Sequence, residues 1–218
     1  MRASTDDLLV SLCARFLEAQ LKGDRRRAVR LLMEQGLDTG LSATDLLLRV
    51  ITPAQREIGR LWEANAVSVA DEHVATAISQ LAMSHLYGRA LPTDIRREHV
   101  LVACVDGEWH DMGARVAADV LEHHGFSVRL LGPSVPVDAL LERVASEAPD
   151  IVLLSMTMDV HAPALTTAVR ALKARFPNLP VLVGGRGCAD RNLAEYGLPH
   201  LTAPRAAVCA EIERLLDA

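Results

Sequence analysis

Apolar residues in the first part of the chain recur at the three- and four-residue spacing of amphipathic α-helices, from about residue 6 to residue 91. Short polar joints separate these stretches, which places neighbouring helices antiparallel. Three stretches open with the residue pair of a capping box. The pairs are Ser42 with Asp45, Thr52 with Gln55, and Ser68 with Asp71. The pattern predicts a four-helix-type bundle over residues 1–91.

The period of the pattern changes after a polar stretch at residues 92–97. Short apolar runs, typical of buried strands, then alternate with amphipathic helical stretches. The runs lie at 99–105, 126–131, 151–156 and 181–185, and the helical stretches at 111–124, 137–147, 162–175 and 205–217. This alternation is typical of a doubly wound parallel sheet. We therefore expect an α/β protein with a helical bundle (1–91), a linker (92–97) and a Rossmann-like or flavodoxin-like domain (98–218).

Composition narrows the classes of function. Half of the residues are hydrophobic but only 3% are aromatic, so aliphatic side chains build the core and few rings can stack on bases. The net charge is −5, and the short basic run Arg25–Arg27 is typical of a solvated helix face. We expect no direct binding of nucleic acid by this chain alone. The four cysteines lack CxxC spacing, and the sequence shows neither a signal peptide nor a membrane-length apolar run, which predicts a cytoplasmic protein without membrane contacts.

Unusual residues follow each predicted strand, where an open parallel sheet binds its ligands. The segments are DGEWHDMG (106–113), GPSVP (132–136), Ser155 with Thr157, and GGRGCA (184–189). None of them matches the GxGxxG or GxxxxGK[ST] pattern of dinucleotide and P-loop sites. Binding of a nicotinamide dinucleotide, or of a nucleotide in a P-loop, is therefore disfavoured.

His110 lies in the first of these loops, with Glu108 two residues before it and Gly113 three residues after it. A carboxylate at this spacing can accept the proton of one ring nitrogen and make the other a better metal ligand. Gly113 lets the following helix approach closely. With no second histidine or cysteine beside it, His110 suits a metal whose other ligands come from a macrocycle. A structural histidine is the alternative.

Glu108, His110 and Gly113, followed by Ser155 and the pair Gly184–Gly185, resemble the DxHxxG…SxL…GG signature of cobalamin-binding domains. The resemblance implies a helical bundle before a Rossmann-like domain, with His110 as the lower axial ligand of cobalt and a groove for the displaced nucleotide tail. The residues of this domain expected at the cofactor are Glu108, Trp109, Asp111, Met112, Gly113, Ser155, Thr157, Gly184, Gly185 and Gly187.

Trp62 is followed, after nine intervening residues, by Glu72 and His73. Helical geometry places the three at one end of the bundle. The spacing is similar to that in adenosylcobalamin-dependent photoreceptors of the CarH type, which implies that these residues cover the upper ligand of cobalt. Glu63 stands where those photoreceptors have a second cobalt-binding histidine, so a bis-histidine light product through position 63 is not expected. A core tryptophan and a Glu–His pair that complements the helix dipole are the alternatives.

The resemblance implies a sensory protein and not an enzyme. It would bind adenosylcobalamin, respond to light, and control transcription through an oligomer change or a transcription-regulator partner. The alternative is a corrinoid carrier subunit of a methyltransferase system, which would use methylcobalamin; hydroxocobalamin is a further form. A flavodoxin-like regulatory domain without a corrin is a third reading.

Overall fold

Two units, Met1–Leu91 and Pro92–Ala218, make up the structure, a computed structural model that describes residues 4–92, 94–95, 98–188 and 208–216. Part of the expected linker, and the start of the last predicted helix, lie outside the described residues. In the described ranges no helix is both long enough and apolar enough to cross a membrane.

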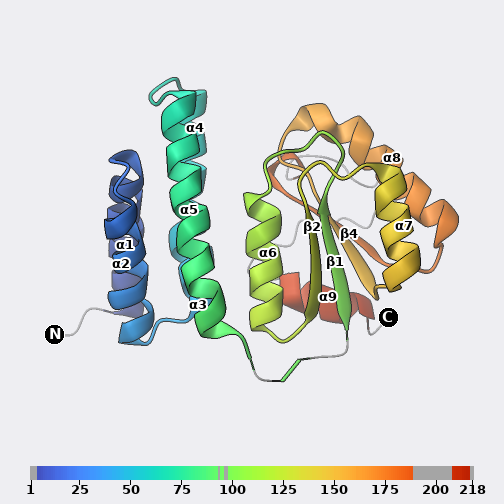
Figure 1. The fold of residues 1–218 in the computed structure, drawn as a ribbon, viewed down its shortest axis with the longest axis horizontal. Helices are drawn as coiled ribbons and strands as arrows, with labels where there is room; N and C mark the ends of the chain where they lie inside the picture. The colour runs from blue at the N-terminus through green and yellow to red at the C-terminus, as the bar shows by residue number, and fades with distance from the viewer. Residues whose placement is uncertain (1–3, 93, 96–97, 189–207, 217–218) are drawn as a thin grey trace. The chain divides into compact units, whose positions relative to one another are not determined.

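The first unit is helical, as the periodicity predicts (Figure 1). Its helices are α1 (Thr5–Leu21), α2 (Arg25–Glu34), α3 (Ala43–Leu46), α4 (Thr52–Glu63) and α5 (Val69–Ala90), with a 3-10 turn, η1 (Leu37–Thr39), after α2. Aliphatic side chains fill its core around the fully buried Phe16. The Ser68 hydroxyl accepts from the Asp71 amide, 3.2 Å away, and the Asp71 carboxylate accepts from the Ser68 amide, so the predicted capping box opens α5.

The predicted capping box at Thr52 is wrong, because the chain is already helical before α4 begins and no side chain caps α4. The π-helical turn η2 (Leu47–Ile51) joins α3 to α4, and the Thr52 amide donates to the Leu47 carbonyl five residues back. The cause is Pro53, which lacks an N–H and whose ring would clash with the carbonyl four residues earlier in a regular helix. Gln55 therefore does not cap a helix; its side chain donates to the Thr76 hydroxyl of α5 at 2.6 Å.

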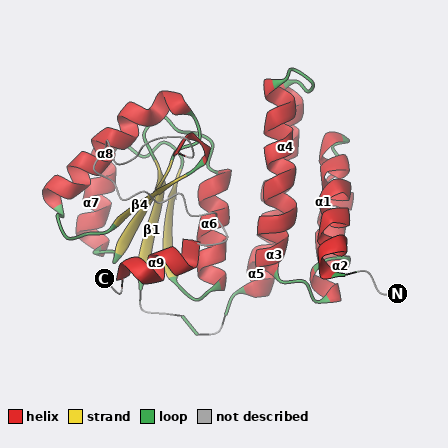
Figure 2. Ribbon diagram, turned by 180° about the vertical axis from the view of Figure 1, so that it is seen from behind, coloured by secondary structure: helices red, strands yellow, loops and turns green. Residues whose placement is uncertain are grey.

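The second unit is a parallel sheet of order β2-β1-β3-β4, which confirms the α/β prediction. The strands are β1 (His99–Cys104), β2 (Ser127–Gly132), β3 (Ile151–Ser155) and β4 (Val181–Gly184). The helices are α6 (Met112–His123), α7 (Val137–Glu147), α8 (Ala162–Arg175) and α9 (Val208–Leu216), with 3-10 turns η3 (Asp159–His161) and η4 (Arg186–Cys188). Helices α6 and α9 cover one face and α7 and α8 the other, so the sheet is doubly wound (Figures 1 and 2).

Alternation along the strands decides which side chains face each helical layer. Leu101, Ala103, Val152 and Leu154 pack in one cluster with residues of α7 and α8. The residues between them, including Cys104 and Ser155, therefore point toward the α6 face. This alternation places the only polar side chain of the described part of β3, Ser155, on the α6 side of the sheet.

Candidate functional site

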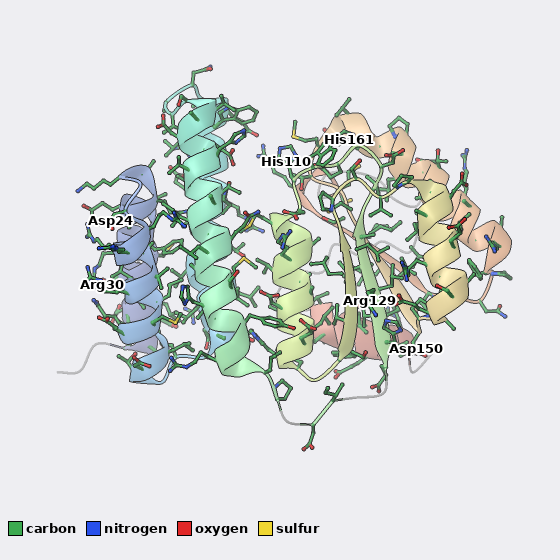
Figure 3. The ribbon with its side chains drawn as sticks, in the orientation of Figure 1. Asp24, Arg30, His110, Arg129, Asp150 and His161 are labelled. Carbon is green, nitrogen blue, oxygen red and sulfur yellow. The ribbon has the colours of Figure 1, made fainter. Side chains whose placement is uncertain are left out.

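The predicted strand-end segments gather at one edge of the sheet. Cys104 at the end of β1 is in register with Ser155 at the end of β3, and Ser155 is in register with Gly184 of β4. The chain leaves β1 toward β2 on one side and returns to β3 on the other, so the β1–β3 boundary is the topological switch point. Ligands of open α/β sheets bind at this position. His110 and His161 both lie at this edge, whereas Arg129 and Asp150 do not (Figure 3).

Glu108 is fully buried between the loops that follow β1 and β3. One carboxylate oxygen accepts from the backbone amide of His110 at 2.9 Å and interacts with Nδ1 of its ring at 2.6 Å. The other accepts from the amides of Thr157 and Met158, both at 2.8 Å. Burial on its own raises the pKa of Glu108, but the hydrogen bonds from His110, Met158 and Thr157 outweigh it and lower the pKa to about 2. Glu108 is therefore ionised at neutral pH and joins the two loops.

The charge on Glu108 decides which nitrogen of His110 carries the proton. An ionised carboxylate only accepts hydrogen bonds, so Nδ1 is the donor and, in a neutral ring, Nε2 holds the lone pair. Nε2 lies on the side of the ring away from the carboxylate, and 54% of the side chain is exposed. A histidine oriented by a carboxylate in this way is the usual form of a metal-binding imidazole.

Ser155 and Thr157 occupy the neighbouring loop. Ser155 is buried and is in register with Cys104 of the neighbouring strand. Burial, with the charges of Asp111 and Glu108, raises the pKa of the Cys104 thiol to about 12, so Cys104 is a neutral packing group and not a thiolate ligand. Thr157 is tied to the site through its backbone amide, and its hydroxyl is 3.4 Å from the His110 carbonyl.

The predicted glycines have two different structural roles. A Cβ at Gly184 would meet no described atom within 4 Å, so this position leaves open space at the end of β4. Gly185 has a φ of +111°, and a Cβ there would lie 2.1 Å from the Met156 carbonyl oxygen. A Cβ at Gly187 would come within 3.1 Å of the Thr157 carbonyl oxygen. Gly185 and Gly187 thus let η4 pack closely on the β3 loop, while Gly184 keeps the edge open.

The remaining predicted residues of this unit surround His110. Trp109 is 71% exposed. Asp111 is buried, and its carboxylate accepts from Arg115 of α6 at 2.7 Å. Met112 and Gly113 form the start of α6 and are half-buried.

Residues that were not predicted also shape the site. The Ser134 amide donates to the Glu108 carbonyl at 2.9 Å, and its hydroxyl accepts from the Gly107 amide at 3.1 Å. Ser134 has a φ of +48° and Gly107 a φ of +82°. A Cβ at Gly107 would be 3.2 Å from the His161 ring. The segment GPSVP marks this loop, but no sequence pattern indicates that a serine adopts the left-handed region.

In the first unit, Trp62 is the last residue but one of α4, and Glu72 and His73 lie in the first turns of α5. The end of α4 and the start of α5 lie at the same end of the helical unit (Figure 1). Trp62 is 38% exposed, so it is not a core residue. Glu72 is mostly buried and His73 is exposed, and Nδ1 of His73 lies 2.6 Å from a carboxylate oxygen of Glu72. The pair repeats, in a helix, the geometry of Glu108 and His110.

Two family models match the chain. Residues 98–201 match the family described as the B12 binding domain, and residues 12–87 match a second family with the same description. Together the matches cover most of both units.

Related proteins fall into two groups. The HTH-type transcriptional repressor CarH of Myxococcus xanthus is 35% identical over 62% of this chain and 45% of that protein. The monomethylamine corrinoid protein 1 of Methanosarcina acetivorans is 25% identical over 83% of this chain and 86% of that protein. The chain spans about half the length of CarH and of its relative CarA from the same organism.

The fold has a close counterpart among solved structures. The Methanosarcina barkeri monomethylamine corrinoid protein superposes with a TM-score of 0.83 at 18% identity, over 94% of this chain and 99% of that protein. At this identity the likeness concerns the fold alone.

Proposed function

The chain belongs to the B12-binding proteins that join a helical cap to a Rossmann-like domain, and we propose that it is an adenosylcobalamin-dependent sensor and not a carrier of methyl groups. The observation that carries the cofactor assignment is the exposed His110 ring held by a buried carboxylate at the switch point of the sheet. The observation that favours a sensor is the exposed Trp62 at the same end of the helical unit as the Glu72–His73 pair.

The residues at the switch point fit a cobalt corrinoid. Imidazole nitrogen is a suitable ligand for cobalt, and the Nδ1 bond to Glu108 leaves Nε2 as the ligating atom. The open space at Gly184 and the α6-facing Ser155 lie next to each other in register, where a long polar group of the cofactor would extend. His110 would donate its lone pair to the metal, and Glu108 would keep the ring oriented and basic.

When bound, adenosylcobalamin supplies a cobalt–carbon bond that light can cleave. In the proposal, Trp62 covers the upper ligand while Glu72 and His73 provide polar contacts to it. Loss of these contacts on illumination would change the relative stability of two conformations of the chain. A signal of this kind requires that the two states make different contacts with a partner or with a second copy of the chain.

A corrinoid carrier in a methyltransferase system is the second candidate. It is favoured by the match to a monomethylamine corrinoid protein over most of both chains. Identity to CarH is higher, at 35% against 25%, and this supports regulation of transcription as the first choice.

An absorption spectrum of the purified chain with adenosylcobalamin in the dark tests the cobalt ligand. We expect the spectrum of a histidine-ligated cofactor, and we expect His110→Ala to lose it. The matched control is His124→Ala, which removes an exposed histidine at the other end of α6. A wild-type spectrum identical to that of the free cofactor, or an unchanged spectrum in His110→Ala, would contradict the assignment.

Illumination of the same sample with green light separates the sensor from the carrier. A sensor should show a light-induced spectral change with adenosylcobalamin, and this change should be altered by Trp62→Ala. A chain that binds methylcobalamin tightly and adenosylcobalamin poorly, with no effect of Trp62→Ala, is a carrier.

A further inference from the structure

A row of polar side chains crosses the otherwise mostly apolar interior of the helical unit and ends at Glu72. We call it the Gln55 network, and its members are Gln20 of α1, Gln55 of α4, and Glu72, Thr76 and Ser79 of α5. Gln20 and Ser79 are almost completely buried. Polar groups in such a position cost free energy unless they are paired, and well-packed aliphatic side chains would serve stability as well. Packing alone therefore does not account for this row.

The hydrogen bonds of the network all point toward Glu72. Gln20 donates to the Ser79 hydroxyl at 2.9 Å, and Ser79 donates to the side-chain oxygen Oε1 of Gln55 at 3.0 Å. Gln55 donates to the Thr76 hydroxyl at 2.6 Å, and Thr76 donates to the carboxylate of Glu72 at 2.7 Å. Aligned bonds of this kind polarise and strengthen one another.

The network occupies one carboxylate oxygen of Glu72 and leaves the other for His73. Oε1 accepts from Thr76, and Gln55 is 3.5 Å from the same oxygen. Oε2 is the atom 2.6 Å from Nδ1 of His73. With both oxygens engaged, the carboxylate is held in one rotamer, and Nδ1 of His73 is the nitrogen that donates.

The π-helical turn explains how Gln55 reaches this position. A π turn inserts one residue and so rotates every later residue of the helix by about 100° relative to a regular helix. Gln55 follows this turn, and Trp62 lies seven residues further, which places the two within about 20° of the same face of α4. The same local distortion therefore sets the direction of Gln55 and of Trp62.

We propose that Gln55 and Thr76 are positioning residues: through Glu72 they hold the His73 ring in the tautomer protonated at Nδ1, with the Nε2 lone pair directed to the upper ligand of the cofactor. The part that concerns the upper ligand rests on the proposed function, while the part that concerns the tautomer does not. Glu108 does the same for His110 with backbone amides in place of Gln55 and Thr76.

The tautomer is measured first, in the full chain without cofactor, from the ring-nitrogen NMR signals of His73 at a pH where the ring is neutral. We expect the wild type to show protonated Nδ1. Thr76→Val removes the hydroxyl at nearly constant volume, and it should lose this signal and give a ring spectrum like that of the exposed His85 on the same helix. Thr76→Ser keeps the donor and should restore the wild-type signal.

The matched control is Thr167→Val, which removes a hydroxyl bonded to a backbone carbonyl in α8. Thermal unfolding of each variant verifies that it folds, and Gln55→Leu is a second variant at an independent position. His73 signals that stay as in the wild type in folded Thr76→Val and Gln55→Leu would overturn the positioning role.

The second measurement uses the chain loaded with adenosylcobalamin. Thr76→Val should change the rate of the light-induced spectral change in the same direction as His73→Ala, with the His110 spectrum retained in the dark. An altered tautomer with an unaltered light response would overturn the link to the upper ligand. Failure of the wild-type chain to bind adenosylcobalamin would instead refute the proposed function, and the tautomer measurement would still decide the role of Gln55 and Thr76.

Discussion

At the scale of single residues, Glu108 shows how a buried charge is made stable. Four hydrogen bonds converge on its two oxygens, three of them from backbone amides that cannot move away without changing the loops. The spacing of Glu108 and His110 predicts their contact. The amides of Thr157 and Met158, 49 and 50 residues further along the chain, are supplied by the tertiary fold, and no local pattern indicates them.

The low pKa of Glu108 makes a prediction about stability. A carboxyl whose pKa is 4.5 in the unfolded chain and about 2 in the folded protein stabilises the fold above pH 4.5, and this contribution is lost as the pH falls from about 4.5 to about 2. The difference corresponds to about 3 kcal/mol. Glu108→Gln should therefore lower the free energy of unfolding at pH 7 by about this amount, and the gap to the wild type should close toward pH 2.

Urea unfolding at a series of pH values measures this gap. The control is Glu142→Gln on the exposed side of α7, which should leave the free energy of unfolding unchanged within about 0.5 kcal/mol. A gap for Glu108→Gln that does not depend on pH would contradict the assigned ionisation.

At the scale of elements, the helices and strands follow from local patterns and the exceptions have tertiary causes. The four predicted strands differ from the observed ones by at most one residue at either end, because short apolar runs bounded by polar residues are typical of the strands of a parallel sheet covered by helices. The Thr52–Gln55 pair has the sequence of a capping box, yet the chain is already helical there. The π turn forms because the preceding helix continues into α4, and the identities of Thr52 and Gln55 alone do not indicate this.

The end of β4 offers a matched test of its two glycines. Gly185→Ala places a methyl group 2.1 Å from the Met156 carbonyl at a φ of +111°, so it should lower the free energy of unfolding by at least about 2 kcal/mol. Gly184→Ala meets open space and should change it by less than about 0.5 kcal/mol. Thermal or urea unfolding of the pair without cofactor measures both effects.

The same two variants also probe the proposed groove. Cobalamin affinity of Gly184→Ala, measured by titration of the absorption spectrum, should fall although stability is retained. Equal stability of the two variants would refute the structural distinction between these glycines, and an unchanged affinity of Gly184→Ala would place the cofactor elsewhere.

At the scale of the whole molecule, each unit contains a histidine held by a carboxylate: His110 by Glu108 and His73 by Glu72. The order of helical and β–α patterns is sufficient to predict the two architectures. The Gln55 network does not follow from the sequence, because Gln20 and Ser79 are polar residues outside the apolar stripes, and only the packing of α1 on α5 buries them.

Association of the chain should respond to light if it is a sensor. We expect sedimentation velocity of the adenosylcobalamin complex to show different association states in the dark and after green light, with the dissociation constant changed by about tenfold, or about 1.4 kcal/mol. The hydroxocobalamin complex has no alkyl ligand to lose and serves as the light control. Trp62→Ala should abolish the response, whereas Tyr87→Ala, which removes an aromatic ring of similar exposure from α5, should retain it.

The carboxylate of Glu108 connects the His110 ring to a loop far away in the sequence. One of its oxygens is bonded to the histidine, and the other accepts from the amides of Thr157 and Met158. If a metal binds Nε2 of His110 as proposed, it would draw electron density from the ring, strengthen the Nδ1 hydrogen bond to the carboxylate and weaken the acceptor strength of the other oxygen toward the two amides. The amide proton resonances of Thr157 and Met158, on the loop after β3, would then report ligation of a ring on the loop after β1.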